Sequence, residues 1–270
     1  MIFVILFAIL IVALVVHLTA RRLFDMEIEA AFAAVGKVAP VAVDRAELPP
    51  LVRAFAERAI GETGDLPTRV SFIQDAALKM RPEAEWTSVT ARQVIGIGAP
   101  AFAWDARADI MPLVGMRVID AYVGGEGRLR VRLLGSIPVA NATGPEVNYG
   151  ELYRYLAELP WAPQAILGNP ALRWRQIDDA TVEVAAETSD GDLARVRLTF
   201  DAAGDITAIE ADDRPREEKG AFLPTRWRGE FTDYRDFGGI RLPAHAEVSW
   251  LLDDGPFTYF RGDLVSYEAD

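Results

Sequence analysis

Hydrophobic residues fill the first twenty positions of the chain and then give way to shorter periodic patterns. Residues 1–20 are apolar except for His17 and Thr19. A run of about 20 apolar residues is long enough to cross the hydrocarbon core of a bilayer as a helix. No Lys or Arg precedes this run, and no small-x-small cleavage site follows it closely, which disfavours a secretory signal peptide. The pattern predicts an uncleaved transmembrane anchor over residues 1–22.

An amphipathic pattern follows in residues 23–65, which we expect to form a helical linker and a helix. Apolar residues recur at helical spacing over 51–60, and Gly61 is a typical helix terminator. Asp44 and Glu47 have the spacing of a capping box ahead of this helix. The polar face carries charges of both signs, so we expect the helix to pack on the domain behind it and not on a membrane.

Residues 66–270 alternate between apolar and polar positions in runs separated by short polar turns. Such alternation predicts consecutive antiparallel strands with one buried face. A sheet of this many strands must curl or partly close. We therefore predict a mainly β (α+β) fold, in which a strongly curved antiparallel sheet or incomplete β-barrel carries a lid helix.

One hairpin of this sheet is predicted with particular clarity. The turn at residues 124–127, "GGEG", lies between two alternating runs. In the second run, arginines alternate with Leu129, Val131 and Leu133. One face of that strand should therefore be basic and the other apolar.

A single helix, predicted over residues 148–159, interrupts the strands. Its tyrosines and leucines recur at i, i+3 and i+4, so this stripe must cover an apolar surface. Glu151 stands three residues after Asn148, which predicts a capping box at the helix N-terminus. Arg154 can pair at helical spacing with Glu151 or with Glu158, and we expect these charges on the face away from the stripe.

The composition excludes several classes of function. The net charge of −12 and the pI of about 4.8 argue against nucleic acid as a partner and against docking on anionic lipid through a basic patch. With no cysteine, the chain has no disulfide, thiolate nucleophile, cysteine zinc site or iron–sulfur cluster. His245 is the one histidine beyond the anchor, and no nucleophile motif accompanies it. We expect no cofactor and no metal.

Aromatic residues are spread over nearly every predicted strand, and two interpretations of them stay open. They form an ordinary sheet core, or they line a concave sheet that holds an apolar ligand. In the second case the lid helix and the strands would supply the candidate ligand-binding residues Tyr149, Leu152, Tyr153, Leu156, Trp161, Trp104, Trp174 and Trp250.

The central part of the chain resembles a bacterial family of unassigned function. The resemblance is carried by "LLGSIPV" at 133–139, "GPE" at 144–146, "GELYRYLAELPWAP" at 150–163 and "LRWRQID" at 172–178. It covers roughly residues 66–268. Members of this family often carry N-terminal transmembrane segments, as this chain does. The resemblance implies no established activity and supplies no catalytic residues.

A second resemblance concerns the C-terminal segment "YRDFGGIRLPAHAEVSW" at 234–250. It is similar to a hairpin of Lol-type lipoprotein carriers. That likeness implies an incomplete, strongly curved antiparallel barrel covered by helices, with an apolar cavity for acyl chains.

The preferred hypothesis is a non-catalytic module, anchored in a bacterial cytoplasmic membrane, that binds a lipid or another apolar ligand in a curved sheet. One alternative is an enzyme that acts on a membrane-proximal substrate through Glu151, Arg154 and Glu158. Another is a structural or assembly partner of a membrane protein. Two arginines, Arg21 and Arg22, follow the span and favour a cytoplasmic domain.

Overall fold

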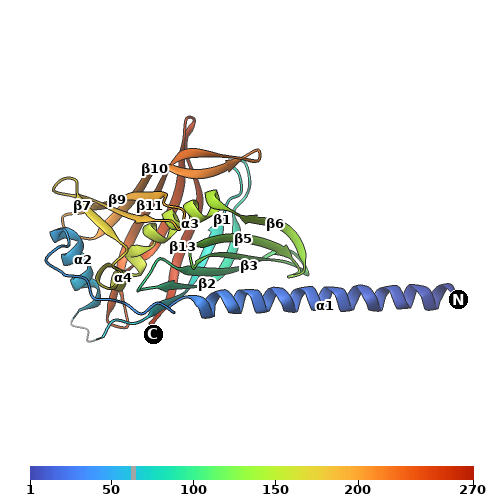
Figure 1. Cartoon of the computed structure of the whole chain (residues 1–270). Coiled ribbons are helices and arrows are strands. Elements are labelled where there is room, and N and C mark those ends of the chain that lie inside the picture. Colours follow the sequence, from blue (N-terminus) through green and yellow to red (C-terminus); the bar gives the residue numbers. More distant parts are fainter. Residues whose placement is uncertain (62–64) are drawn as a thin grey trace.

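The computed structural model describes residues 1–61 and 65–270 of the chain. A single antiparallel sheet curls into a half-barrel, with helices on its concave side and one long helix outside it (Figure 1). The helices are α1 (Ile2–Ala34), α2 (Pro50–Ile60), α3 (Pro145–Ala157), the 3-10 turn η1 (Leu159–Trp161) and α4 (Pro163–Gly168). This confirms the predicted mainly β fold with an incomplete barrel.

The strands follow one another along the sheet in two meanders that meet in its middle. The strands are β1 (Arg69–Leu78), β2 (Thr87–Gly96), β3 (Phe102–Met111), β4 (Val114–Val123), β5 (Glu126–Leu133), β6 (Ile137–Thr143), β7 (Arg173–Gln176), β8 (Thr181–Glu187), β9 (Leu193–Phe200), β10 (Ile206–Glu218), β11 (Ala221–Phe237), β12 (Ile240–Leu252) and β13 (Gly255–Ala269). Their order is β6-β5-β4-β3-β2-β1-β13-β12-β11-β10-β9-β8-β7. Pairing of the first strand with the last therefore joins the two meanders.

Helix α3 lies inside the half-barrel, between β4–β6 on one side and β8–β10 on the other (Figure 1). Its side chains Leu152, Tyr155 and Leu156 are fully buried in the main core. Helix α2 packs on α4 and β12, as expected for a helix that belongs to the domain. The predicted capping box before α2 is wrong, because α2 begins at Pro50 and Asp44 Oδ1 accepts from the Ala46 amide in a separate turn.

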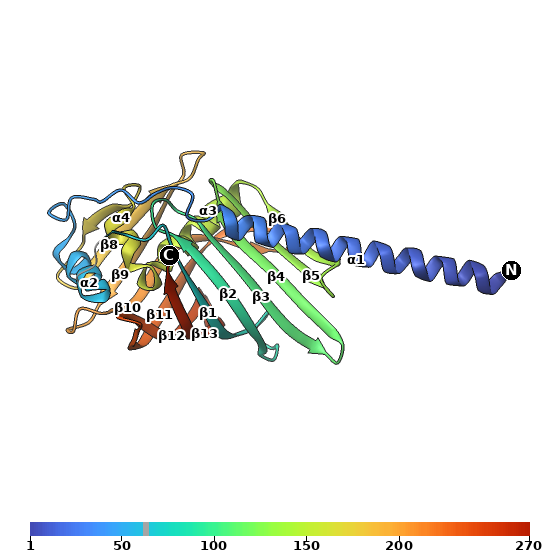
Figure 2. The ribbon, with the colours of Figure 1, turned by 90° about the horizontal axis from the view of Figure 1, so that it is seen from below.

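Helix α1 packs on the convex face of the sheet with only its second half. Phe24 and Ile28 are fully buried there, against Val94 on β2 and Ile119 on β4. The first half projects away from the half-barrel as far as the N-terminus (Figure 2). The most apolar window of α1 has a mean hydropathy of 3.1, and none of it is buried. By length and composition, α1 can cross a membrane.

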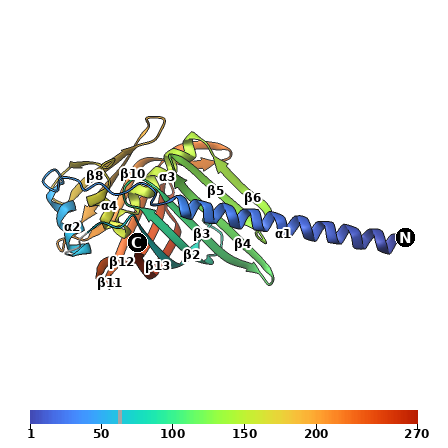
Figure 3. The same ribbon diagram turned by 60° about the horizontal axis from the view of Figure 1, so that its bottom comes forward.

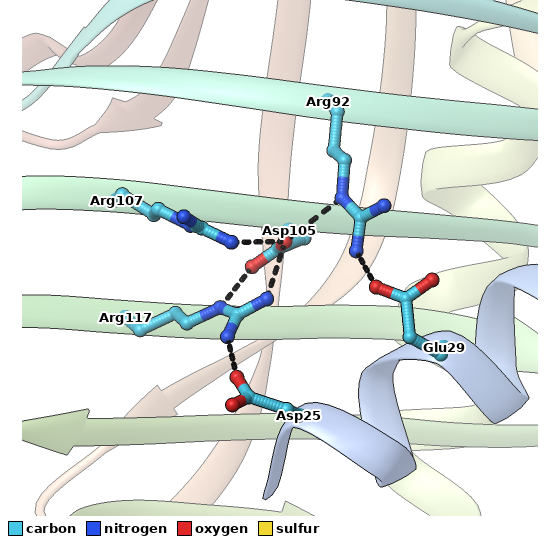
Figure 4. A network of polar contacts seen from close by, with 6 residues as sticks. All are labelled: Asp25, Glu29, Arg92, Asp105, Arg107 and Arg117. Carbon is cyan, nitrogen blue, oxygen red and sulfur yellow. Dashed lines mark hydrogen bonds and ion pairs between the residues drawn. The ribbon is translucent and has the colours of Figure 1, made fainter. Parts of the chain in front are cut away.

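An ion-pair network fixes α1 to the sheet (Figure 4). Asp105 on β3 accepts from Arg92 Nε at 2.9 Å and from Arg117 Nε at 2.7 Å. The same two arginines bind Glu29 and Asp25 of α1. Burial alone would raise the pKa of Asp105, but the hydrogen bonds and charges of Arg117 and Arg92 outweigh it and lower that pKa. The basic face predicted for β5 takes part as well, since Arg130 and Arg132 contact α1.

We expect Asp105→Asn to destabilise the protein by about 3 kcal/mol, because it leaves two arginines without their buried counter-charge. The lowered pKa stabilises the folded state above about pH 4, and this contribution is lost as the pH falls through the folded-state pKa. Denaturant unfolding of both proteins from pH 7 to pH 3 measures the difference, which should shrink in acid. Asp109→Asn, an exposed carboxylate on the same strand, is the matched control. A difference that stays constant with pH would contradict this account.

Candidate functional site

The concave face is layered, because side chains opposite each other on adjacent antiparallel strands form rows across the sheet. Next to the main core, Gln93, Trp104 and Asp120 lie opposite one another on β2, β3 and β4. We call these three residues the polar row. All three strands interrupt their buried apolar face at this position. A row of polar groups therefore crosses the interior of the half-barrel.

Beyond the polar row the concave face becomes apolar and rich in small side chains. Ala91, Ala106, Val118 and Val131 lie opposite one another in the next row. With their neighbours and Trp104 of the polar row they form a hydrophobic cluster to which only strands contribute. We call its other members the apolar strip: Ala76, Leu78, Val89, Ala91, Ala106, Ala108, Met116, Val118, Leu129, Val131 and Phe260. Six of these side chains stay half-buried: Ala76, Leu78, Met116, Leu129, Val131 and Phe260.

Helix α3 places an arginine directly on the polar row. Arg154 donates from Nη1 to Asp120 Oδ2 at 2.5 Å and from Nε to Glu158 Oε1 at 2.8 Å. Its guanidinium carbon lies 5.2 Å from the centre of the Trp104 ring. Glu158 also accepts from the Gln93 amide. Burial alone would lower the pKa of Arg154, but the charges of Glu158 and Asp120 raise it, so the arginine stays charged.

Glu151 is the buried carboxyl of this cluster that makes no ion pair among the described residues. Burial raises its pKa well above the ordinary range. The charges of Asp120 and Glu158 add to this shift, and those of Arg214 and Arg154 oppose it. Glu151 therefore takes up a proton at a higher pH than an ordinary glutamate does.

Several buried polar atoms of the cluster have no hydrogen-bond partner within residues 1–61 and 65–270. They are Glu151 Oε2, Asp120 Oδ1, Gln93 Oε1 and Trp104 Nε1, and the same holds for both amide atoms of Gln74, which lies opposite Ala91 in the next row. An unsatisfied buried polar group costs about 1–3 kcal/mol, so native proteins pair nearly all of them with protein, water or ligand.

A second cationic group faces the interior from the other side of α3. Arg214 on β10 donates to the Gly150 carbonyl and to Tyr259 Oη at 3.2 Å. Its guanidinium carbon lies 4.4 Å from the Trp227 ring centre and 5.5 Å from that of Trp250. Arg214 has no carboxylate within 4 Å in the described part of the chain. Its charge is thus balanced by aromatic faces and by more distant carboxyls.

The structure separates the eight aromatic and aliphatic candidate residues into different places. Leu152, Tyr153, Leu156 and Trp161 are buried in the main core, and the half-buried Tyr149 packs against it. The tyrosine and leucine stripe of α3 therefore fills part of the concave side of the sheet. Trp250 beside Arg214 and Trp174 on the edge strand β7 also pack against the main core, whereas Trp104 lies in the polar row.

The predicted capping role of Glu151 is wrong. Helix α3 begins at Pro145, after Gly144 with φ of 117°, so Glu151 lies in its second turn. Asn148 Oδ1 instead accepts from the Gly127 amide at 2.7 Å. The expected pairing of Arg154 with Glu158 is confirmed, but these charges do not lie on an outer face, because sheet surrounds α3 on both sides.

The residues that sequence reasoning missed are Gln74, Gln93, Asp120 and Arg214. In each case the signal was a polar residue at a position where the alternation calls for a buried apolar one, as for Asp120 in "VIDAYV". That signal marks single strands, and it does not show that Gln93, Asp120 and Arg214 lie around one helix.

We expect Glu151→Gln to be more stable than the natural protein at neutral pH. A carboxyl with a raised folded-state pKa stabilises most below its unfolded pKa of about 4.3, and this contribution is lost as the pH rises towards the folded value. Glutamine keeps the shape and cannot ionise. Unfolding free energies measured from pH 4 to pH 8 should therefore diverge, with the variant ahead at the upper end. Parallel curves would show that Glu151 ionises as freely in the folded state as in the unfolded state.

Comparison with known proteins yields one family and several solved structures. The sequence model described as "Family of unknown function (DUF6544)" matches residues 40–262. No curated protein matches the chain. A putative outer membrane lipoprotein-sorting protein domain from Vibrio parahaemolyticus is 11% identical, with a TM-score of 0.46 over 84% of this chain and 94% of that one.

Two further solved structures are similar at the same level. A LolA superfamily protein from Nitrosomonas europaea is 12% identical, with a TM-score of 0.41 over 81% of this chain and 93% of that one. A DUF1329 family protein from Desulfovibrio piger is 9% identical, with a TM-score of 0.43 over 82% of this chain and 94% of that one.

Proposed function

The chain belongs to the DUF6544 family of unknown function, and from its own geometry we propose a membrane-anchored, non-catalytic module that binds a lipid-like molecule. The observation that carries this proposal is the order of layers on the concave face. An apolar strip of strands runs directly beside a row of buried polar groups. A molecule with an apolar chain and a polar end matches both layers at once.

Side-chain size on the strip supports an elongated apolar ligand. Small alanine side chains at 76, 91, 106 and 108 form the floor of the strip. Larger apolar side chains such as Met116 and Phe260 flank this floor. Burial of apolar surface contributes about 25 cal/mol per Å², so an acyl chain on this floor gains affinity without any specific contact. The polar end would then meet Gln93, Asp120 and the α3 charges.

The anchor supplies a reason for lipid as the ligand. Helix α1 carries an exposed apolar segment long enough to cross a bilayer, and ion pairs hold its second half on the sheet. The domain would thus stay within reach of lipid at all times. Arg21 and Arg22 follow the apolar segment and favour the cytoplasmic side for the domain.

Photo-crosslinking of the full chain in nanodiscs tests this function. The discs contain a phosphatidylcholine with a diazirine on one acyl chain, and crosslinked peptides are mapped by mass spectrometry. We expect crosslinks on α1 and also on the β3–β5 segment that carries Ala106, Val118 and Val131. Crosslinks confined to α1 would support the membrane anchor and contradict lipid binding in the half-barrel.

A second candidate function is an enzyme acting on a membrane-proximal substrate, and the raised pKa of the buried Glu151 favours it. A buried carboxyl with a raised pKa can serve as a general acid, here beside Asp120, the ion-pair partner of Arg154. Mass spectrometry of the nanodisc lipids would reveal new products with the natural protein and none with Glu151→Gln. Identical lipid profiles would exclude this role for those lipids.

A further inference from the structure

Two hairpin turns beside α1 carry leucines at positions that normally suit glycine. The β3–β4 turn is Pro112–Leu113, and Leu113 has φ of 68° with 97% of its surface exposed. The β5–β6 turn contains Leu134 with φ of 53°. A left-handed backbone favours Gly, Asn or Asp, and leucine there is both strained and exposed to water.

Two other turns at the same end of the sheet are polar, although Lys219 in one of them also has a left-handed backbone, with φ of 52°. The β10–β11 turn is Lys219–Gly220 and the β12–β13 turn is Asp253–Asp254. The leucines are therefore a property of the two turns next to α1. Strained residues persist where they serve a function that offsets their cost.

More exposed apolar residues surround these two leucines. We call the whole set the apolar rim, and its members are Ile110, Met111, Leu113, Leu134, Ile137 and Val139. They occupy the ends of β3, the start of β6 and the turns themselves. Exposed apolar residues gathered at one end of a sheet point to contact with a protein or a membrane.

The place where α1 leaves the half-barrel indicates which contact it is. His17 Nδ1 lies 2.6 Å from Ser136 Oγ in the β5–β6 turn. A side chain on Gly135 would come within 3.2 Å of Arg21, so the turn also touches the helix one turn later. The exposed apolar segment of α1 lies on the N-terminal side of this contact. It extends away from the turns towards the N-terminus (Figures 2 and 3). A bilayer crossed by that segment would have its interface at the level of the rim.

We propose that the apolar rim inserts into the interface of the same bilayer that α1 crosses, and so faces one end of the apolar strip towards lipid. This proposal rests on the membrane anchoring proposed above. Met116 of the strip pairs with Leu133 next to both turns, so the strip reaches the rim. A depression of about 370 Å³ between α1 and the turns, lined by His17, Arg21, Leu113 and Leu134, would lie at headgroup depth.

Spin labels can measure the depth of the rim directly, because the chain has no cysteine and each single-cysteine variant carries one label. The full chain is placed in phosphatidylcholine nanodiscs with Leu113→Cys or Ile137→Cys as test positions. Leu10→Cys in α1 is the hydrocarbon reference, and Asp254→Cys in the β12–β13 turn is the water reference. Accessibility to oxygen and to a water-soluble nickel complex gives the depth of each label.

The expected result is that both test labels favour oxygen over nickel, at depths between the two references. If Leu10 lies in hydrocarbon and the test labels match Asp254, membrane insertion of the rim is overturned and the anchor stands. If the Leu10 label is itself in water, the anchor and the proposal fail together. Test labels shielded from both reagents would indicate a protein partner and overturn the proposal.

Leu113→Gly with Leu134→Gly separates the rim's role from folding. Glycine relieves the left-handed strain at both turns, so the variant should unfold no more easily than the natural protein. A label at Ile137 in this background should move towards water. An unchanged depth would show that the leucines do not hold the rim in the membrane.

Discussion

Replacing Arg154 by methionine is expected to destabilise the half-barrel by roughly 3–5 kcal/mol, the usual cost of removing one partner of a buried ion pair. Arg154 bonds to both Asp120 and Glu158 and lies close to Glu151. Without it, the carboxyl groups of Asp120, Glu158 and Glu151 share this site without a bonded cation. Equilibrium unfolding in denaturant, followed by tryptophan fluorescence, measures the loss.

A matched variant shows whether burial causes the effect. Arg173→Met removes an arginine from an ion pair with Glu187 in which both side chains are largely exposed, and it should cost less than about 1 kcal/mol. Adding Asp120→Asn and Glu158→Gln to Arg154→Met should recover much of the stability, because the unpaired charges are gone. If Arg154→Met costs no more than Arg173→Met, the cluster does not act as a buried charge network.

The strands and their hairpins were predictable because their signals are local. The "GGEG" turn between two alternating runs gives the β4–β5 hairpin, and the alternation of arginines with leucines and valine gives both faces of β5. The basic face could not be assigned a partner from the sequence. Its contact with Phe24 and Glu27 of α1 joins residues about a hundred positions apart.

The polar site was not predictable for the same physical reason. Residues 93, 104 and 120 come together through the register of three strands, and α3 contacts this row through Arg154 and Glu158 at the end of the helix. A sequence pattern shows that Glu151 shares a helix with Arg154, but it does not show what surrounds that helix. The amphipathic pattern predicted the charged residues of α3 on an outer face, because such a pattern normally means that one helix face is solvated. In the structure, α3 has sheet on both sides.

Ala106→Phe is expected to lower the yield of acyl-chain crosslinks on the β3–β5 segment at least tenfold, while crosslinks on α1 stay unchanged. Ala106 lies in the middle of the apolar strip, opposite Ala91 and Val118. The side chain of Ala106 has no exposed surface, so a phenyl ring there would displace the apolar neighbours that a ligand chain would contact.

The stability of the same variant decides between the two interpretations of the aromatic and apolar side chains as a filled core or a ligand-binding surface. In a tightly packed core, extra atoms force side chains out of their rotamers and cost about 1–3 kcal/mol. On a floor that receives a ligand chain, the ring buries apolar surface and costs little or stabilises the ligand-free protein. Ser88→Phe on the exposed convex face of β2 controls for the added ring itself. A destabilised Ala106→Phe with undiminished crosslinks would place the lipid elsewhere and leave the strip as part of the core.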